Sequence, residues 1–120
     1  MSPRILPPCP SSPNCVSTQA TDEGHAIDAI RYRKVKAEAK EALKKAMRSL
    51  PRTQLVDEDE SYLHYECTSL LFRFVDDVEF VFDDATKTLH FRSASRTGYG
   101  DFGVNRKRME EIRRLVSGTL

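Results

Sequence analysis

The segment that decides the fold is residues 77–96, which read DVEFVFDDATKTLHFRSASR. Two runs of alternating apolar and polar residues, Asp77–Phe82 and Thr88–Arg96, flank a short polar connection. Alternation with a period of two is typical of a strand that buries one face. A connection of this length joins neighbouring antiparallel strands. The segment therefore predicts two adjacent strands of an antiparallel sheet.

Two further strands and two helices extend this pair along the chain. Strands are predicted at Thr53–Asp57 and Tyr62–Leu71, and helices at about residues 31–50 and 104–117, where apolar residues recur at helical spacing. Because the connections between strands are short, neighbours in the chain should also be neighbours in the sheet. The order α-β-β-β-β-α predicts an α+β fold, with a four-stranded antiparallel meander and both helices packed on one face.

Residues 1–30 differ in composition from the rest of the chain. They hold five of the six prolines and show little apolar periodicity, which predicts an extended Pro/Ser-rich arm. Residues 31–117 are predicted to form a single α+β domain, since a chain of 120 residues can bury one hydrophobic core.

The overall charge and the apolar runs exclude two classes of partner. Nineteen basic and eighteen acidic residues give a net charge of +1, which lacks the long-range positive field of a general nucleic-acid binder. No apolar run approaches the ~20 residues of a membrane span. Residues 1–8 lack the apolar core of a signal peptide. The composition predicts a soluble globular protein with no export signal in this chain and an unknown compartment.

Alternation within the four strands assigns side chains to the two faces of the sheet. The face predicted to pack on the helices carries Leu63, Tyr65, Cys67, Leu71, Val78, Phe80, Phe82, Leu89 and Phe91. The opposite face carries His64, Glu66, Thr68, Glu79, Val81, His90, Arg92 and Arg96. This polar face is either a solvated surface with cross-strand ion pairs or the floor of a ligand groove.

Residues 92–106 concentrate polar groups where the last strand meets the last helix. Three arginines, two serines, an asparagine, an aspartate and three glycines fall within these fifteen residues. Such a junction either binds an anionic or polar group or forms a hydrogen-bonded structural corner. For binding, Arg96 and Arg106 would supply charge, and Ser95 and Asn105 would orient the ligand by hydrogen bonds. The candidate ligand-binding residues are Arg92, Ser95, Arg96, Asn105 and Arg106.

Residues 98–103 match the pattern G-x-G-x-x-G between a strand and a helix. A dinucleotide-binding fingerprint also requires a following parallel strand and an acidic residue about twenty positions further on. The seventeen residues after Gly103 are too few, and Asp101 would repel a pyrophosphate. The glycines are therefore interpreted as turn residues that permit a positive φ angle, and Asp101 or Asn105 as the helix cap.

Arg108 shares a helix face with apolar residues, so its guanidinium group is predicted to lie against the sheet. A buried arginine needs a carboxylate partner. The adjacent Asp76 and Asp77 are the expected partners, with Glu79 as a substitute. Arg108 either forms this structural ion pair or contributes to a ligand site.

The three cysteines fall into two groups. Cys9 and Cys15 are predicted to form a disulfide under oxidising conditions, because they are close in sequence and the prolines between them restrict the loop. Their spacing is too wide for a C-x-x-C redox pair, and the ligands of a zinc ribbon are missing. Cys67 is predicted to be a buried and inert thiol. The alternative is an enzyme in which Cys9 or Cys15 acts as a nucleophile that His25 activates.

No metal site and no cofactor are predicted. His64 and His90 share a face with Glu66, but a strand between them would separate them by about 10 Å. Residues 57–60 alternate acidic side chains without the glycine and the distant glutamate of a calcium loop, so they are interpreted as a solvated turn.

Three separated motifs occur in order along the chain. They are Cys9-Pro-Ser-Ser-Pro-Asn-Cys15-Val-Ser, then Asp76-Asp77-Val-Glu-Phe80, then Arg92-Ser-Ala-Ser-Arg96 with Gly98, Asp101, Gly103, Asn105, Arg106 and Arg108. Together they resemble the DUF1499 family, a family of unknown function, over about residues 9–116. Family members often look secreted, membrane-anchored or plastid-targeted, which would suit a bridge between Cys9 and Cys15. The resemblance implies no established activity.

The residues favour a non-catalytic small domain that binds a small anionic or polar ligand, or an acidic group on the surface of a partner. One alternative is a hydrolase or thiol-dependent enzyme that uses Cys9 or Cys15 with His25. The other is a structural or interaction module of the cell envelope, in which the same motifs only hold the fold. We expect a binding domain and not an enzyme.

Overall fold

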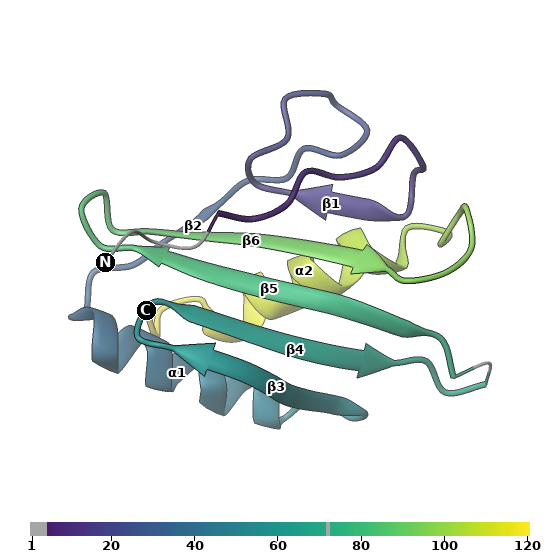
Figure 1. Cartoon of the computed structure of the whole chain (residues 1–120). Coiled ribbons are helices and arrows are strands. Elements are labelled where there is room, and N and C mark those ends of the chain that lie inside the picture. Colours follow the sequence, from purple (N-terminus) through teal and green to yellow (C-terminus); the bar gives the residue numbers. More distant parts are fainter. Residues whose placement is uncertain (1–4, 72) are drawn as a thin grey trace.

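Six strands and two helices are formed by residues 5–71 and 73–120, which this computed structural model describes. The elements are β1 (Cys15–Ser17), β2 (Ile30–Arg31), α1 (Lys36–Arg48), β3 (Thr53–Asp59), β4 (Tyr62–Thr68), β5 (Val75–Asp83), β6 (Thr88–Ser95) and α2 (Val104–Val116). The strands pair antiparallel in one sheet with the order β1-β6-β5-β4-β3, and β2 also pairs with β6 (Figure 1). The α+β class and the antiparallel sheet are as predicted.

The predicted number of four strands is wrong, because the arm supplies two more. β1 pairs with the end of β6, where Cys15 faces Ala94, and β2 pairs with its start, where Ile30 faces Leu89. Strands of two or three residues are too short to show an alternating pattern, and their partner strand is distant in the chain. The first helix is shorter than predicted, Lys36–Arg48 against about residues 31–50, and β2 occupies Arg31.

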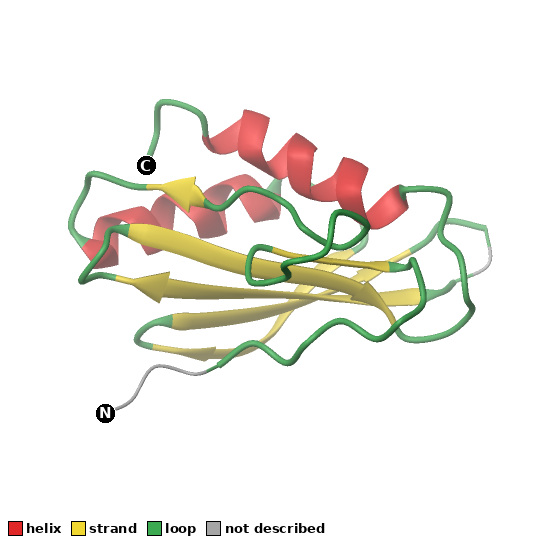
Figure 2. Ribbon diagram, turned by 90° about the horizontal axis from the view of Figure 1, so that it is seen from above, coloured by secondary structure: helices red, strands yellow, loops and turns green. Residues whose placement is uncertain are grey.

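Both helices cover the same face of the sheet, as predicted (Figures 1 and 2). Their buried side chains belong to one hydrophobic core with the inner face of the strands. From the helices this core takes Ala39, Leu43, Met47, Met109, Ile112 and Val116. Neither of these helices is long and apolar enough to cross a membrane.

Alternation along the strands separates the two faces as predicted, with one exception. Phe80 in β5 pairs with Leu63 in β4 and with Phe91 in β6, and all three side chains are fully buried in the core. The predicted core residue Leu71 lies beyond the end of β4, which stops at Thr68, and is 82% exposed. The apolar run therefore continues past the strand into a loop.

Candidate functional site

A disulfide closes the first motif and brings the arm to the end of β6. Cys9 and Cys15 are bonded, with their Cα atoms 5.7 Å apart, so this prediction is confirmed. Inside the closed loop, Asn14 accepts a hydrogen bond from Ser12 Oγ and donates one from Nδ2 to the carbonyl of Gly98. The arm is thereby tied to the connection between β6 and α2.

Asn105, in the first turn of α2, lies at the centre of a buried hydrogen-bond network. Its Oδ1 accepts from Ser93 Oγ at 2.6 Å. Its Nδ2 donates to Ser95 Oγ at 3.0 Å and to the carbonyl of Asn14 at 3.2 Å. Asn105 and Ser93 are both fully buried. The network therefore joins β6 and α2 through their side chains, and joins both to the arm through the backbone carbonyl of Asn14.

Arg108 lies against the sheet, three residues further along α2. Its Nη2 is 2.7 Å from Asp76 Oδ2, and its Nη1 donates to Asn105 Oδ1 and Ser93 Oγ. Asp77 does not share this contact, because adjacent residues of β5 point to opposite faces of the sheet. Of the three carboxylates expected near Arg108, only Asp76 contacts it in the described part of the chain.

Arg96 and Asp77 belong to a separate cluster on the polar face. Arg96 Nε and Nη2 each donate to the Asp77 carboxylate at 2.8 Å, and Nη2 also donates to Glu66. His64 Nε2 lies 2.8 Å from Asp77 Oδ1. Burial opposes the charged form of Asp77, but the hydrogen bonds from Arg96 and His64 hold its pKa below the ordinary value. This cluster is a set of ion pairs between β4, β5 and the end of β6.

The structure does not bring Arg96 and Arg106 together around one point. Arg106 donates to the carbonyls of Ala26 and Gly24 in the arm, at 2.9 and 3.3 Å. Arg96 instead faces the carboxylates of the polar face. The two guanidinium groups therefore hold different parts of the fold.

Asp101 occupies the start of α2. Its Oδ1 accepts from the backbone N–H of Gly103 at 2.8 Å, and its Oδ2 accepts from the backbone N–H of Asn105 at 3.1 Å. Burial alone would raise the pKa of Asp101, but these hydrogen bonds and one from Asn105 Nδ2 lower it below the ordinary value. A carboxylate of the chain itself thus fills the position where an external anion would bind.

The arm crosses the polar face before it reaches the disulfide. Leu6 is buried in a small cluster with Tyr62 and Val81, and the carbonyl of Pro8 accepts a hydrogen bond from Arg92 Nη2 at 3.3 Å. Arg92 Nε is buried and has no hydrogen-bond partner among the described residues. This part of the face is therefore covered by the chain and is not a freely solvated surface.

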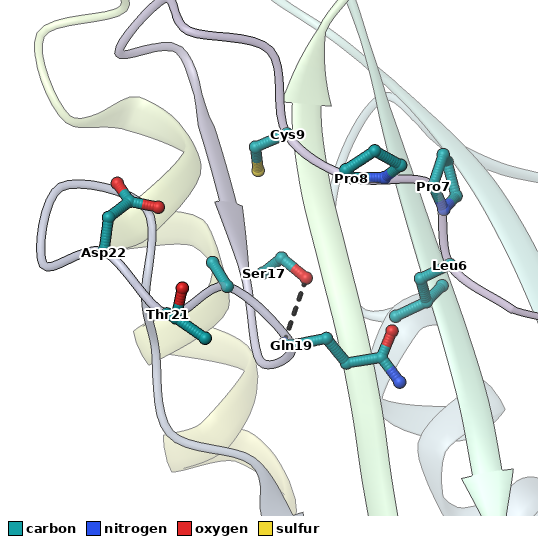
Figure 3. A pocket seen from close by; sticks show the side chains of 9 residues that line it. Leu6, Pro7, Pro8, Cys9, Ser17, Gln19, Thr21 and Asp22 are labelled. Atoms are coloured by element: carbon teal, nitrogen blue, oxygen red, sulfur yellow. Dashed lines mark hydrogen bonds between the residues drawn. The ribbon is translucent and has the colours of Figure 1, made fainter.

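The arm and the loop after β1 line a half-open pocket of about 340 Å³ (Figure 3). Pro7 and Pro8 line one side of it, and Thr21 and Asp22 line the other. Asp22 is the only charged side chain among its lining residues, and its Oδ2 lies 2.6 Å from His25 Nδ1. The lining offers no cation for an anionic ligand.

The residues of the enzyme alternative are engaged in other contacts. The sulfur atoms of Cys9 and Cys15 are bonded to each other, so neither is a thiol. His25 Nε2 lies 2.8 Å from the carbonyl of Ser12, and this contact together with a neighbouring carboxylate raises the pKa of His25. Burial raises the pKa of the Cys67 thiol. The described part of the chain holds no group of three His, Cys, Asp or Glu residues placed to bind a metal ion.

The model of a family described as "Protein of unknown function (DUF1499)" matches residues 5–116. The chain belongs to the DUF1499 family. Comparisons with curated proteins and with solved structures found no match. In this DUF1499 chain the three motifs meet in one network, through Asn14 of the first, Asp76 of the second, and Asn105 and Arg108 of the third.

One member of this DUF1499 network is not predicted as a site residue, although the first motif contains it. Asn14 lies in a segment without periodicity, and its partners Gly98 and Asn105 are distant in the chain. Ser93 is different, because alternation along β6 already predicts that its hydroxyl faces α2.

Proposed function

We propose that this DUF1499 domain acts by binding and not by catalysis, and that its polar corner holds the fold. The polar corner comprises Asn14, Asp76, Ser93, Ser95, Asp101, Asn105 and Arg108. One observation carries the proposal: the side chains of the other six residues and the backbone carbonyl of Asn14 form one hydrogen-bond network across the arm, the sheet and α2. Groups that satisfy one another in a buried network stabilise a single arrangement, and a substrate could reach them only by breaking it.

A small-anion site at Arg92, Ser95, Arg96, Asn105 and Arg106 has weaker support. An anion at Arg96 would compete with the carboxylates of Glu66 and Asp77. An anion at the start of α2 would compete with Asp101. We therefore infer that the binding surface lies outside the polar corner and away from Arg92, Arg96 and Arg106.

Thermal shift in phosphate, sulfate and small carboxylates tests this inference. The natural protein is compared with a variant carrying Arg96→Ala and Arg106→Ala, and with a Lys44→Ala and Lys45→Ala control on α1. We expect the melting temperatures of all three proteins to respond equally to added anion, because the two arginines already have acceptors in the chain. Stabilisation that grows with anion concentration and vanishes only in the Arg96 and Arg106 variant would overturn the proposal and assign an anion site.

A further inference from the structure

Six large apolar side chains are exposed at one end of the sheet. Phe102 is 99% exposed, Leu71 82% and Tyr99 72%, so the fold itself gives them little packing. The whole set, which we name the apolar end, is Leu70, Leu71, Phe74, Tyr99, Phe102 and Val104. Gathering of exposed apolar residues in one place marks an interaction site more often than scattered exposure does.

These residues come from two loops that lie side by side. The β4–β5 and β6–α2 connections leave the same end of the sheet (Figures 1 and 2). At their bases, the backbone N–H of Arg96 donates to the carbonyl of Val75 at 3.1 Å. Leu70 in the β4–β5 loop and Val104, the first residue of α2, line the same groove of about 380 Å³. The apolar end is therefore one surface.

Both loops are fixed at their bases while their tips project. The backbone N–H of Ser69 donates to the carbonyl of Phe74, and the backbone N–H of Phe74 donates to Ser69 Oγ, both at 2.9 Å. Asn14 and Asp101 hold the β6–α2 loop by hydrogen bonds to its backbone. The exposed side chains are thus presented by anchored loops and not by a fraying terminus.

The exposed charges around the apolar end that make no ion pair with a described residue are basic. Arg52, Arg73 and Lys107 are exposed and make no ion pair with a described residue. The acidic groups beside them are engaged, since Glu111 pairs with Arg114 and Asp101 caps α2. The surface therefore combines projecting apolar tips with cations whose charge is not neutralised.

We propose that the apolar end docks on the surface of an anionic lipid bilayer, an inference that rests on the proposed binding function. Apolar loop tips enter the boundary between headgroups and acyl chains, and neighbouring Lys and Arg side chains attract anionic headgroups. A bilayer deforms around each projecting loop tip, so it needs no pockets that match the apolar side chains. A second copy of the chain would place the same three cations opposite one another, which disfavours self-association through this end.

A single tryptophan reports insertion directly, because the natural chain has none. Phe102→Trp places the reporter at the apolar end, and Val35→Trp places it at an exposed apolar position before α1, at the other end of the sheet. The vesicles contain either phosphatidylcholine alone or equal parts of phosphatidylcholine and phosphatidylglycerol. We expect the emission of Phe102→Trp to shift to shorter wavelength with the mixed vesicles only. The emission of Val35→Trp should not move.

Co-sedimentation with the same vesicles measures the contribution of each group. Phe102→Ser should lower the partition coefficient by at least about tenfold, since a buried phenyl ring is lost, and Val35→Ser should leave it unchanged. Arg73→Gln with Lys107→Gln should lower it by about twenty-fivefold, or about fivefold for each cation. Arg33→Gln with Lys34→Gln removes the same charges elsewhere and is the matched control. The four charged positions are exposed, so unchanged melting temperatures of the two charge variants verify their folding.

Three outcomes would overturn the docking proposal. The first is absence of binding to the mixed vesicles, and the second is equal loss in the variants and their controls. The third is a concentration-dependent dimer, seen by analytical ultracentrifugation and abolished by Phe102→Ser, which would assign the apolar end to a second copy. None of these results bears on the anion thermal shift, so the proposed function stands or falls separately.

Discussion

Asp76 and Asp77 are neighbours in the chain but serve different faces of the sheet. Asp76 contacts Arg108 beneath α2, whereas Asp77 binds Arg96 on the polar face. The sequence presents them as one source of negative charge for Arg108. Alternation along β5 places them on opposite faces. The same Asp→Asn substitution should therefore change the free energy of unfolding by different amounts at the two positions.

We predict that Asp76→Asn lowers the free energy of unfolding by about 3 kcal/mol, because it leaves Arg108 buried without its counter-charge. Asp77→Asn should cost about 1 kcal/mol, since its side chain is more exposed and water can replace part of what is lost. Urea titrations of both variants and the natural protein measure the difference. An equal cost at the two positions, or a larger one at Asp77, would contradict this assignment of faces.

At the scale of elements, the arm is attached to β6 by short pairings and a disulfide. β1 and β2 contribute five residues in all to the sheet, so backbone pairing alone gives the arm few hydrogen bonds. The disulfide closes the loop that carries Asn14 into the polar corner. Its loss should therefore weaken the arm more than the rest of the fold.

We predict that Cys9→Ser with Cys15→Ser lowers the free energy of unfolding by about 2 kcal/mol, the value that the loop-entropy model gives for so short a loop. Cys67 should resist alkylation in the native oxidised protein and react after denaturation, because its thiol is buried. Urea titration measures the first result. Mass spectrometry after iodoacetamide treatment, with and without denaturant, measures the second. Native labelling of all three cysteines would show that the bridge does not form.

The elements that the sequence predicts are those with a repeated pattern. Alternation predicts β4 to β6 within a few residues, and helical spacing predicts α2 at 104–117 against an observed Val104–Val116. β1 and β2 have no such pattern, since their pairing is fixed by distant contacts. At Leu71 a pattern is present but gives a wrong prediction, because the apolar run continues from the strand into an exposed loop.

At the scale of the whole molecule, β5 is the central strand. It pairs with β4 on one side and with β6 on the other, and its inward side chains are buried beneath the helices. β3 lies at an edge of the sheet, and a β-bulge between Leu55 and Asp57 interrupts its pairing. Stability should therefore fall from the centre of the sheet to its edges.

We predict that the backbone amides of β5 exchange with deuterium most slowly, and that those of β2 and β3 exchange soonest. Native-state hydrogen exchange, followed by mass spectrometry of peptides, measures the order. Faster exchange in β5 than in β3 would contradict the central position of β5 in the stable unit.

The candidate site could be predicted only as a region. Residues 92–106 are singled out by their polar density, and the roles of Arg108 and Asp101 follow from helix periodicity and capping rules. The partners of Arg96 and Arg106 depend on which face each side chain occupies and on where the arm lies. These partners are set by the tertiary structure, and neither the composition of the chain nor the spacing of its residues predicts them.

The pairing of β1 and β2 with β6 has a consequence for synthesis of the chain. Translation produces the arm first, but the strand that receives it is completed only at Ser95. Until then Ile30 and Val16, both buried in the finished core, lack the strand with which they pair. The nascent chain must therefore carry its arm unpaired through most of its elongation, and the domain closes only when its last strand emerges.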